Sequence, residues 1–452
     1  MMIHEEARRG RGRALFGVMV VGLLLAAGAC KSSSSSSSSS SSTSASGSSA
    51  SSGASASSVA ATVDDRAPGV TADTIKVGVT YPDLASLKDV LHIDNGDFEK
   101  AFSAVASDIN AKGGVNGRKL QLVFAPINPT QPNAFDAACT KLTQDEKVFV
   151  AVGFFLGDNV NCYLNTNPTP TIGGEQTTDR LSGAQVAWYS TDPSQDSQAD
   201  VAKALADGGK LAGKVAVVGN ATGDQALYET SIKPVLTAAK VNIVDEAFID
   251  APSTDAEANY AQAQTFAEKF KADGAEQVLV VGNGASPGFV TGLARTDYRP
   301  LLRFTIASSL AAYITAAGSD LTPLTGAASG GGYDGQSLYE KLGGPTKECL
   351  DGQTAAGLAL KPANQVASGE TKQISSSGQA CTQMYLLKAI LEKAGATLNF
   401  GTFKTAGDNL GQITLPMSPD PWTFGPPPAA DGNPKVYLSA WDPTSKTMQQ
   451  VG

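Results

Sequence analysis

The stretch Asp108–Leu120, with the sequence DINAKGGVNGRKL, joins a helix pattern to a strand pattern and decides the class of fold. Before it, apolar residues recur three and four positions apart from Phe98 to Ile109, which predicts a helix with one buried face. Gly113-Gly114 supplies a stop, because glycine tolerates the left-handed backbone that follows a helix. A strand-like run resumes over Lys119–Phe124. A helix that returns directly to a strand is typical of α/β folds.

The same alternation continues along the chain on both sides of this stretch. We predict strands over Ile75–Val79, Lys119–Phe124, Val148–Val152, Pro170–Ile172, Val215–Val218, Ile243–Ile249, Val278–Val281 and Phe304–Ile306. We predict helices over Phe98–Ile109, Ala134–Leu142, Val201–Ala206, Gln225–Ala239 and Tyr260–Phe270. The series restarts after about Tyr189. Two successive series of this kind predict an α/β protein with two doubly wound, Rossmann-like lobes.

The C-terminal quarter has a different pattern. Gln383–Ala394 reads as a helix, Ile413–Leu415 as a short strand, and residues 416–428 as a proline-rich segment. That segment either covers the hinge side of a cleft or forms a rigid surface loop. Lys435–Ser439 is predicted to be an edge strand followed by a turn at Asp442-Pro443.

The N-terminus carries an export signal. Four arginines precede an apolar run, Ala14–Ala29, that ends in small residues just before Cys30. The run is too short to favour a stable membrane span. Its end resembles a bacterial lipobox, which implies a signal peptide at 1–29 and a lipid on Cys30; an ordinary signal peptide or an uncleaved anchor is the alternative. Residues 30–62, rich in Ser, Ala and Gly, predict a disordered tether.

Charge and length restrict the partners. Residues 1–29 carry four Arg and two Glu, so removing them takes the formal net charge from −9 to −11. Such an acidic surface argues against nucleic acid or an anionic membrane surface as a partner. The remaining body of nearly 390 residues exceeds one hydrophobic core, which predicts two domains.

The number and spacing of the cysteines and histidines restrict which catalytic and metal sites the chain can form. Four cysteines besides Cys30 in an exported chain indicate disulfides, and Cys139–Cys162 with Cys349–Cys381 is the simplest of three connectivities; four buried thiols are the alternative. Their spacing fits no zinc site. Only His92 remains in the mature chain, and no hydrolase, zinc-protease or P-loop motif is present, so we expect no catalytic site, metal or cofactor. Gly282–Gly288 lacks the spacing of a dinucleotide fingerprint.

Three segments together resemble the type I periplasmic binding proteins, specifically the branched-chain (Leu/Ile/Val) amino-acid-binding family. They are Ile75–Val79, Asp108–Leu120 and Val436–Trp441, and the resemblance covers about Thr74 to Gln449. It implies two lobes joined by three crossings near a hinge. Cys139 and Cys162 match the position of a family disulfide.

The resemblance also implies domain limits and partners. We place the crossings near Tyr189–Asp192, Gly331–Gly343 and Leu398–Thr405. Lobe 1 then takes residues 73–190 plus 340–398, and lobe 2 takes 191–339 plus 399–449. A ligand between the lobes would stabilise the closed form, which a membrane permease of an ABC importer would recognise.

Ligands of open α/β sheets bind beyond the carboxyl ends of the strands. The strand-end residues that we predict to bind ligand are Thr80, Tyr81, Phe154, Phe155, Glu175, Gln176, Thr177, Asp224, Tyr228, Asn283, Ser286 and Ser308. Each of these loops has a purely structural alternative role.

Two of these loops depart from the pattern of the amino-acid binders. Gly153–Gly157 replaces a Ser/Thr-rich turn, and Gly173–Thr177 replaces a small-residue turn. The segment Ala307–Ser309 lacks the acid that holds the ligand ammonium in the family. Glu175 is the candidate replacement; an aromatic acid, an amide or another small polar metabolite is the alternative ligand.

The sequence thus predicts a monomeric, non-enzymatic solute-binding lipoprotein on the outer face of a bacterial cell membrane, in contact with the bilayer only through its lipid. It would capture an amino acid or related small polar metabolite for an ABC permease. A ligand-sensing receptor of the same fold, without a transport role, is the alternative. An exported enzyme is disfavoured by the single histidine and the missing motifs.

Overall fold

The computed structural model describes residues 67–451, apart from 85–93, 129–130, 132, 193–196, 252–254, 283–284, 307–309, 311–312, 315–319, 332–342, 362–365, 367–369, 419, 428, 433–434 and 445–446. The predicted signal peptide at 1–29, the lipid site Cys30 and the tether at 30–62 lie outside the described residues. Among the described helices, none has both the length and the apolar character that crossing a bilayer requires.

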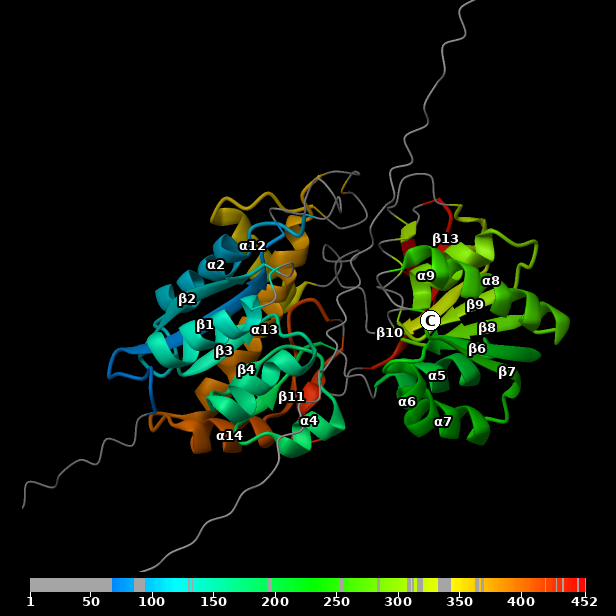
Figure 1. Ribbon diagram of the computed structural model, residues 1–452. Coiled ribbons are helices and arrows are strands. Elements are labelled where there is room, and N and C mark those ends of the chain that lie inside the picture. The colour runs from blue at the N-terminus through cyan, green and yellow to red at the C-terminus, as the bar shows by residue number, and fades with distance from the viewer. Residues whose placement is uncertain are drawn as a thin grey trace, which may run out of the picture.

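The first lobe is built on a five-stranded parallel sheet in the order β2-β1-β3-β4-β5. Its strands are β1 (Thr74–Pro82), β2 (Lys119–Ile127), β3 (Val150–Gly153), β4 (Thr171–Ile172) and β5 (Trp188–Tyr189). Its helices are α2 (Phe98–Ala111), α3 (Ala134–Thr140), α4 (Thr178–Gly183), α12 (Gly344–Ala355), α13 (Gln373–Ala394) and α14 (Phe400–Asp408). Figure 1 shows α2, α12 and α13 close to β1 and β2.

Both faces of this sheet are covered, as a parallel sheet requires. Successive side chains of a strand point to opposite faces, so Ile75, Val77 and Val79 of β1 enter the core that α2 and α13 complete. On the other face, Ala125 and Ala151 belong to a separate core with α3. The stretch Asp108–Leu120 joins a helix to a strand, as predicted: α2 ends at Ala111, and β2 begins at Lys119.

The second lobe has a seven-stranded sheet in the order β14-β13-β10-β9-β8-β6-β7. Its strands are β6 (Lys214–Asn220), β7 (Asn242–Ile249), β8 (Gln277–Val280), β9 (Leu301–Phe304), β10 (Ala328–Gly331), β13 (Tyr437–Asp442) and β14 (Thr447–Gln450). Its helices include α5 (Ser197–Asp207), α6 (Asp224–Leu227), α7 (Lys233–Ala238), α8 (Ala256–Ala272) and α9 (Ala285–Ala294). Successive side chains of β6 also point to opposite faces of the sheet, so Val215 and Val217 lie in one core and Ala216 and Val218 in the other.

Three local predictions need correction. β13 is not an edge strand, because it pairs antiparallel with both β10 and β14. The predicted helix Gln225–Ala239 consists of α6, a π-helical turn over Tyr228–Ile232 and α7, which has the proline in its first turn. Pro234 cannot donate a backbone hydrogen bond, so the helix is interrupted before it. β9 begins three residues before the predicted Phe304–Ile306.

The chain passes between the lobes three times. It leaves the first lobe after β5 and returns between β10 and α12, where residues 332–342 lie outside the described set. The prediction that the third crossing lies near Leu398–Thr405 is wrong. Phe403 of α14 packs on Phe149, with ring centroids 5.5 Å apart, and Leu415, Phe424 and Ala430 belong to the same first-lobe core. The crossing therefore follows residue 431 and precedes β13.

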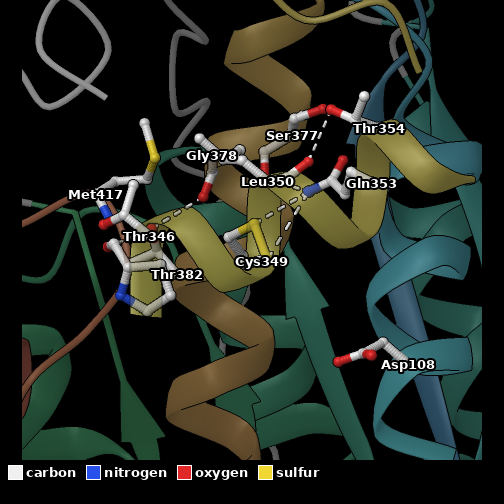
Figure 2. The surroundings of a disulfide bond; sticks show 12 residues. Asp108, Thr346, Cys349, Leu350, Gln353, Thr354, Ser377, Gly378, Thr382 and Met417 are labelled. Carbon is white, nitrogen blue, oxygen red and sulfur yellow. Dashed lines mark hydrogen bonds between the residues drawn. A yellow bond between two sulfur atoms is a disulfide. The ribbon is translucent and has the colours of Figure 1, made fainter. Parts of the chain in front are cut away.

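The proline-rich segment is attached to the first lobe as well. Met417 donates its backbone N–H to Thr346 Oγ1 (2.8 Å), and Figure 2 labels both residues. Thr382 Oγ1 donates to the Pro416 carbonyl (3.2 Å). The short hairpin β11 (Gly411–Ile413) and β12 (Trp422–Phe424) completes this region. The segment is thus part of the first-lobe structure, packed on α12 and α13.

Both disulfides have the predicted local connectivity, Cys139–Cys162 and Cys349–Cys381. The second joins α12 to α13, and both of its cysteines are buried. Gln353 Nε2 donates to Cys381 Sγ (3.0 Å) and to the Ser377 carbonyl (2.9 Å), beside the bond in Figure 2. The disulfide fixes α12, the first helix after the second crossing, to the helix that covers β1.

Replacing Cys349 and Cys381 together with serine is expected to lower the free energy of unfolding by about 3 kcal/mol. The bond closes a loop whose ends are 32 residues apart, and opening it returns that chain entropy to the unfolded state. Urea unfolding measures the loss. The matched double variant at Cys139 and Cys162, with a separation of 23, should lose slightly less; no loss in either variant would contradict the entropic account.

Candidate functional site

The predicted site lies where the strands of each sheet end, and two glycines shape it in the first lobe. Gly153 ends β3 with φ +126°, and Gly173 follows β4 with φ +115°. A Cβ on Gly153 would lie 2.0 Å from the Thr80 carbonyl oxygen, and one on Gly173 would lie 2.3 Å from the Gly153 carbonyl oxygen. The ends of β1, β3 and β4 are therefore in direct backbone contact, and only glycine fits between them.

Thr80 and Tyr81 both make structural contacts. Thr80 is buried, and its Oγ1 donates to the Phe154 carbonyl (2.8 Å), which ties the end of β1 to the loop after β3. Tyr81 stacks on Phe98 with ring centroids 5.6 Å apart, and its hydroxyl donates to Glu99 Oε1 (2.6 Å). Burial and then the Glu99 hydrogen bond raise the pKa of Tyr81 far above its usual range, so this hydroxyl stays protonated.

Besides Thr80, three further predicted residues have buried side chains. Phe155 packs edge-on against Tyr163 in the first-lobe core, with ring centroids 5.1 Å apart. Gln176 is fully buried, and its Nε2 donates to the Trp188 carbonyl (2.9 Å). Tyr228 is buried in the second-lobe core, where its hydroxyl donates to Glu246 Oε1 (2.7 Å). Phe154 is only half-buried, beside Phe135.

Glu175 and Asp224 come from opposite lobes and are close enough to interact. Glu175 follows the Gly173-Gly174 turn and is half-buried. Asp224 starts α6 just after β6, and its Oδ2 accepts the Asn220 backbone N–H (2.9 Å). Burial, and then the charge of Glu175, raise the pKa of Asp224 to about 6. Two carboxylates from different lobes therefore lie within electrostatic range of each other at the strand ends.

Of the four remaining predicted ligand-binding residues, the structure describes the side chain of Thr177 alone. Thr177 caps α4, its Oγ1 accepting the Arg180 backbone N–H (3.3 Å). Ser286 lies in the first turn of α9, but its side chain is outside the described set. Asn283 and Ser308 lie outside the described residues, as does the segment Ala307–Ser309.

The sequence did not identify the residues that support these turns. Gln383 of α13 donates from Nε2 to the Gly153 carbonyl (3.3 Å), although 230 positions separate them. Asp192 and Ser190, in the first crossing, bind the main chain of Gly174. Burial raises the pKa of Asp192. The only signal in the sequence was that Asp192 lies in the predicted first crossing, near Tyr189–Asp192.

A pocket of about 330 Å³ lies at the end of β1. It is lined by residues 81–84 and 94–99, which include the carboxylates of Asp83, Asp94, Asp97 and Glu99. Within the described parts of the chain, no group of three or more His, Cys, Asp or Glu side chains is arranged to hold a metal ion. The pocket extends the acidic character of the strand-end region.

Comparison with known proteins agrees with this architecture. A family model described as periplasmic binding protein matches residues 74–443. No curated protein sequence was found to match this chain significantly.

Solved structures of the same fold carry different ligands. An ABC transporter substrate-binding protein from Desulfitobacterium hafniense, in complex with Leu, is 16% identical with a TM-score of 0.61, covering 84% of this chain and all of its own. A solute-binding protein from R. palustris, in complex with 4-hydroxybenzoate, is 17% identical with a TM-score of 0.57, covering 84% of this chain and 96% of its own. A leucine-binding protein from Thermotoga maritima is 10% identical with a TM-score of 0.59, covering 84% and 98%.

Because these identities are low, the solved structures support the fold alone. The match to the family model supports membership of the family. That match spans the two lobes and all three crossings, from β1 to the residue after β13. The chain belongs to the periplasmic binding protein family.

Proposed function

We propose that this protein is an extracytoplasmic solute-binding lipoprotein of an ABC importer, and that its ligand is an amino acid or related small polar metabolite with a cationic group. The ligand lies between the lobes and the closed form docks on the permease. Cys30 carries the lipid anchor, and the serine-rich tether gives the folded body its reach.

The observation that carries the ligand class is the Glu175–Asp224 pair. Each carboxylate comes from a different lobe, and the charge of Glu175 raises the pKa of Asp224. Two like charges near each other repel, and a cation bound between them would remove that repulsion. A cationic group would therefore stabilise the arrangement in which both lobes contact it, which is how ligand binding favours closure.

The test is a thermal-shift screen of the purified protein against amino acids, amides, ureas, amines and aromatic acids. A ligand at 100 times its dissociation constant should add roughly 2.7 kcal/mol of stability. We expect the responding compounds to carry an ammonium or guanidinium group. A response confined to aromatic acids without a cation would refute the cationic ligand, and catalytic turnover without any stabilising ligand would refute the binding role.

Asp224→Asn is expected to stabilise the ligand-free protein at pH 7.5 by up to about 3 kcal/mol while weakening cation binding. An acid whose pKa is about 6 when folded and 3.8 when unfolded binds more protons in the folded state between those values, so stability falls as pH rises through this interval. Asn keeps an acceptor for the Asn220 N–H and removes the charge.

Melting temperatures at pH 4 and pH 7.5 measure the effect of this substitution. The gain should shrink toward zero at pH 4, where Asp224 is protonated in the folded protein. Asp145→Asn, at an exposed carboxylate, is the matched control and should change neither melting temperature. A gain that does not depend on pH would show that the carboxylate charge is not its cause.

A further inference from the structure

The first crossing, after β5, holds the turn that carries Glu175 through hydrogen bonds to both the backbone N–H and the carbonyl of Gly174. Gly174, the residue before Glu175, donates its backbone N–H to Asp192 Oδ2 (2.9 Å). Its carbonyl accepts from Ser190 Oγ (2.7 Å), and the same Oγ accepts the Asp192 backbone N–H (2.9 Å). Gly174, Ser190 and Asp192 thus form a closed set of three hydrogen bonds.

The same crossing is attached to the third one. Ser190, which is fully buried, donates its backbone N–H to the Ala430 carbonyl (3.0 Å). Ala430 belongs to the first-lobe core, immediately before the chain passes to β13. Asp431 lies near Asp200 of α5 in the second lobe, since its charge contributes to the raised pKa of Asp200 after burial. The Gly174 turn therefore connects to two of the three crossings.

Accepting the Gly174 N–H with the carboxylate of Asp192 has a free-energy cost, because the charge is partly withdrawn from water. Asp192 is partly buried, and burial of a charged group is costly unless the charge is paired; among the described residues no ion pair of a Lys or Arg with Asp192 is found. The carboxylate gives a stronger, charge-assisted bond to a residue adjacent to the ligand contact.

We propose that Asp192 is a positioning residue that couples the ligand-contacting turn at Gly174-Glu175 to the hinge. The inference rests on the proposed function, in which Glu175 contacts the ligand. Lobe rotation changes the backbone of the crossings, and Asp192 transmits that change to the turn. By reciprocity, a ligand that fixes Glu175 fixes the crossings.

The primary test needs no ligand. Hydrogen–deuterium exchange is measured on the purified protein and on the Asp192→Ala, Asp192→Asn and Ser190→Ala variants. We expect Asp192→Ala to raise exchange severalfold in two segments together, residues 171–178 and residues 429–437. Asp192→Asn retains an acceptor for Gly174 and should restore most of the protection. Asp145→Ala is the exposed control.

The outcomes decide between a coupling role and a local one. Increased exchange confined to 171–178, or equal effects of the Asn and Ala variants, would overturn the proposal. If Asp192→Ala does not fold, Ser190→Ala and Asp192→Asn still test it, because Ser190→Ala breaks the same set of bonds and must also loosen 429–437.

A second measurement separates this inference from the proposed function. The probe is a mixture of the twenty standard amino acids with putrescine and agmatine, and the readout is the concentration giving half of the maximal thermal shift. We expect Asp192→Ala to raise it about tenfold and Asp192→Asn no more than about threefold. If the unmodified protein does not respond, the ligand class fails while the exchange result still decides on coupling. If it responds and Asp192→Ala matches it, the coupling fails while the ligand class holds.

Discussion

Glu175→Gln is expected to weaken binding of a cationic ligand roughly 10- to 100-fold. A hydrogen bond to a charged partner contributes about 1.5–3 kcal/mol, and the substitution keeps the shape of the side chain while removing the charge. The pKa of Asp224 should also fall, because the charge of Glu175 contributes to its raised value. Isothermal titration with the ligand found in the screen measures the first effect, and NMR titration of the Asp224 carboxyl measures the second.

The control for this substitution is Glu268→Gln on α8, where an exposed carboxylate loses the same charge. It should leave affinity and the pKa of Asp224 unchanged. Unchanged affinity in the Glu175 variant, with a normal melting temperature, would remove Glu175 from the site. A lowered pKa of Asp224 with unchanged affinity would show that the two carboxylates interact but do not share the ligand.

Gly153→Ala is expected to destabilise the protein by at least about 4 kcal/mol, the largest effect on stability that we predict. The new Cβ would lie 2.0 Å from the Thr80 carbonyl oxygen, a main-chain atom of the adjacent strand that cannot rotate away. The φ of +126° adds backbone strain for any L side chain. The ends of β1 and β3 would have to separate, breaking the bond from Thr80 Oγ1 to Phe154.

Urea unfolding measures this loss, and Gly352→Ala is the matched control. Gly352 lies within α12, a Cβ added to it would meet no neighbouring atom within 4 Å, and its φ is ordinary. Alanine favours helices over glycine by about 1 kcal/mol, so the control should be neutral or slightly stabilising. A Gly153→Ala variant as stable as the control would contradict the packing at these strand ends.

The alternation of strands and helices was predictable because it depends on local periodicity. The apolar face of α2 and the glycine stop after it needed no distant partner to be recognised. The third crossing was not predictable in this way. Phe403 belongs to the first lobe because it meets Phe149, and no local pattern around Leu398–Thr405 records a contact over that separation.

The candidate site shows the same division. The strand-end rule selected the loops, and it brought Glu175 and Asp224 near each other across the lobes. It did not distinguish side chains that stay accessible at the strand ends from those that turn into a core, as Phe155, Gln176 and Tyr228 do. Burial of this kind depends on packing partners such as Tyr163 and Glu246, which come from other elements.

The position of α13 and β13 in the two lobes has a consequence for how the protein acquires its structure during export. The apolar face of β1 is covered by α13, and β10 is paired by β13, so each lobe needs residues from the last fifth of the chain. A chain that emerges from a membrane pore N-terminus first cannot complete the first lobe before Gln373–Ala394 has emerged. Both lobes therefore mature late and nearly together, and the emerging polypeptide must be kept from aggregating until then.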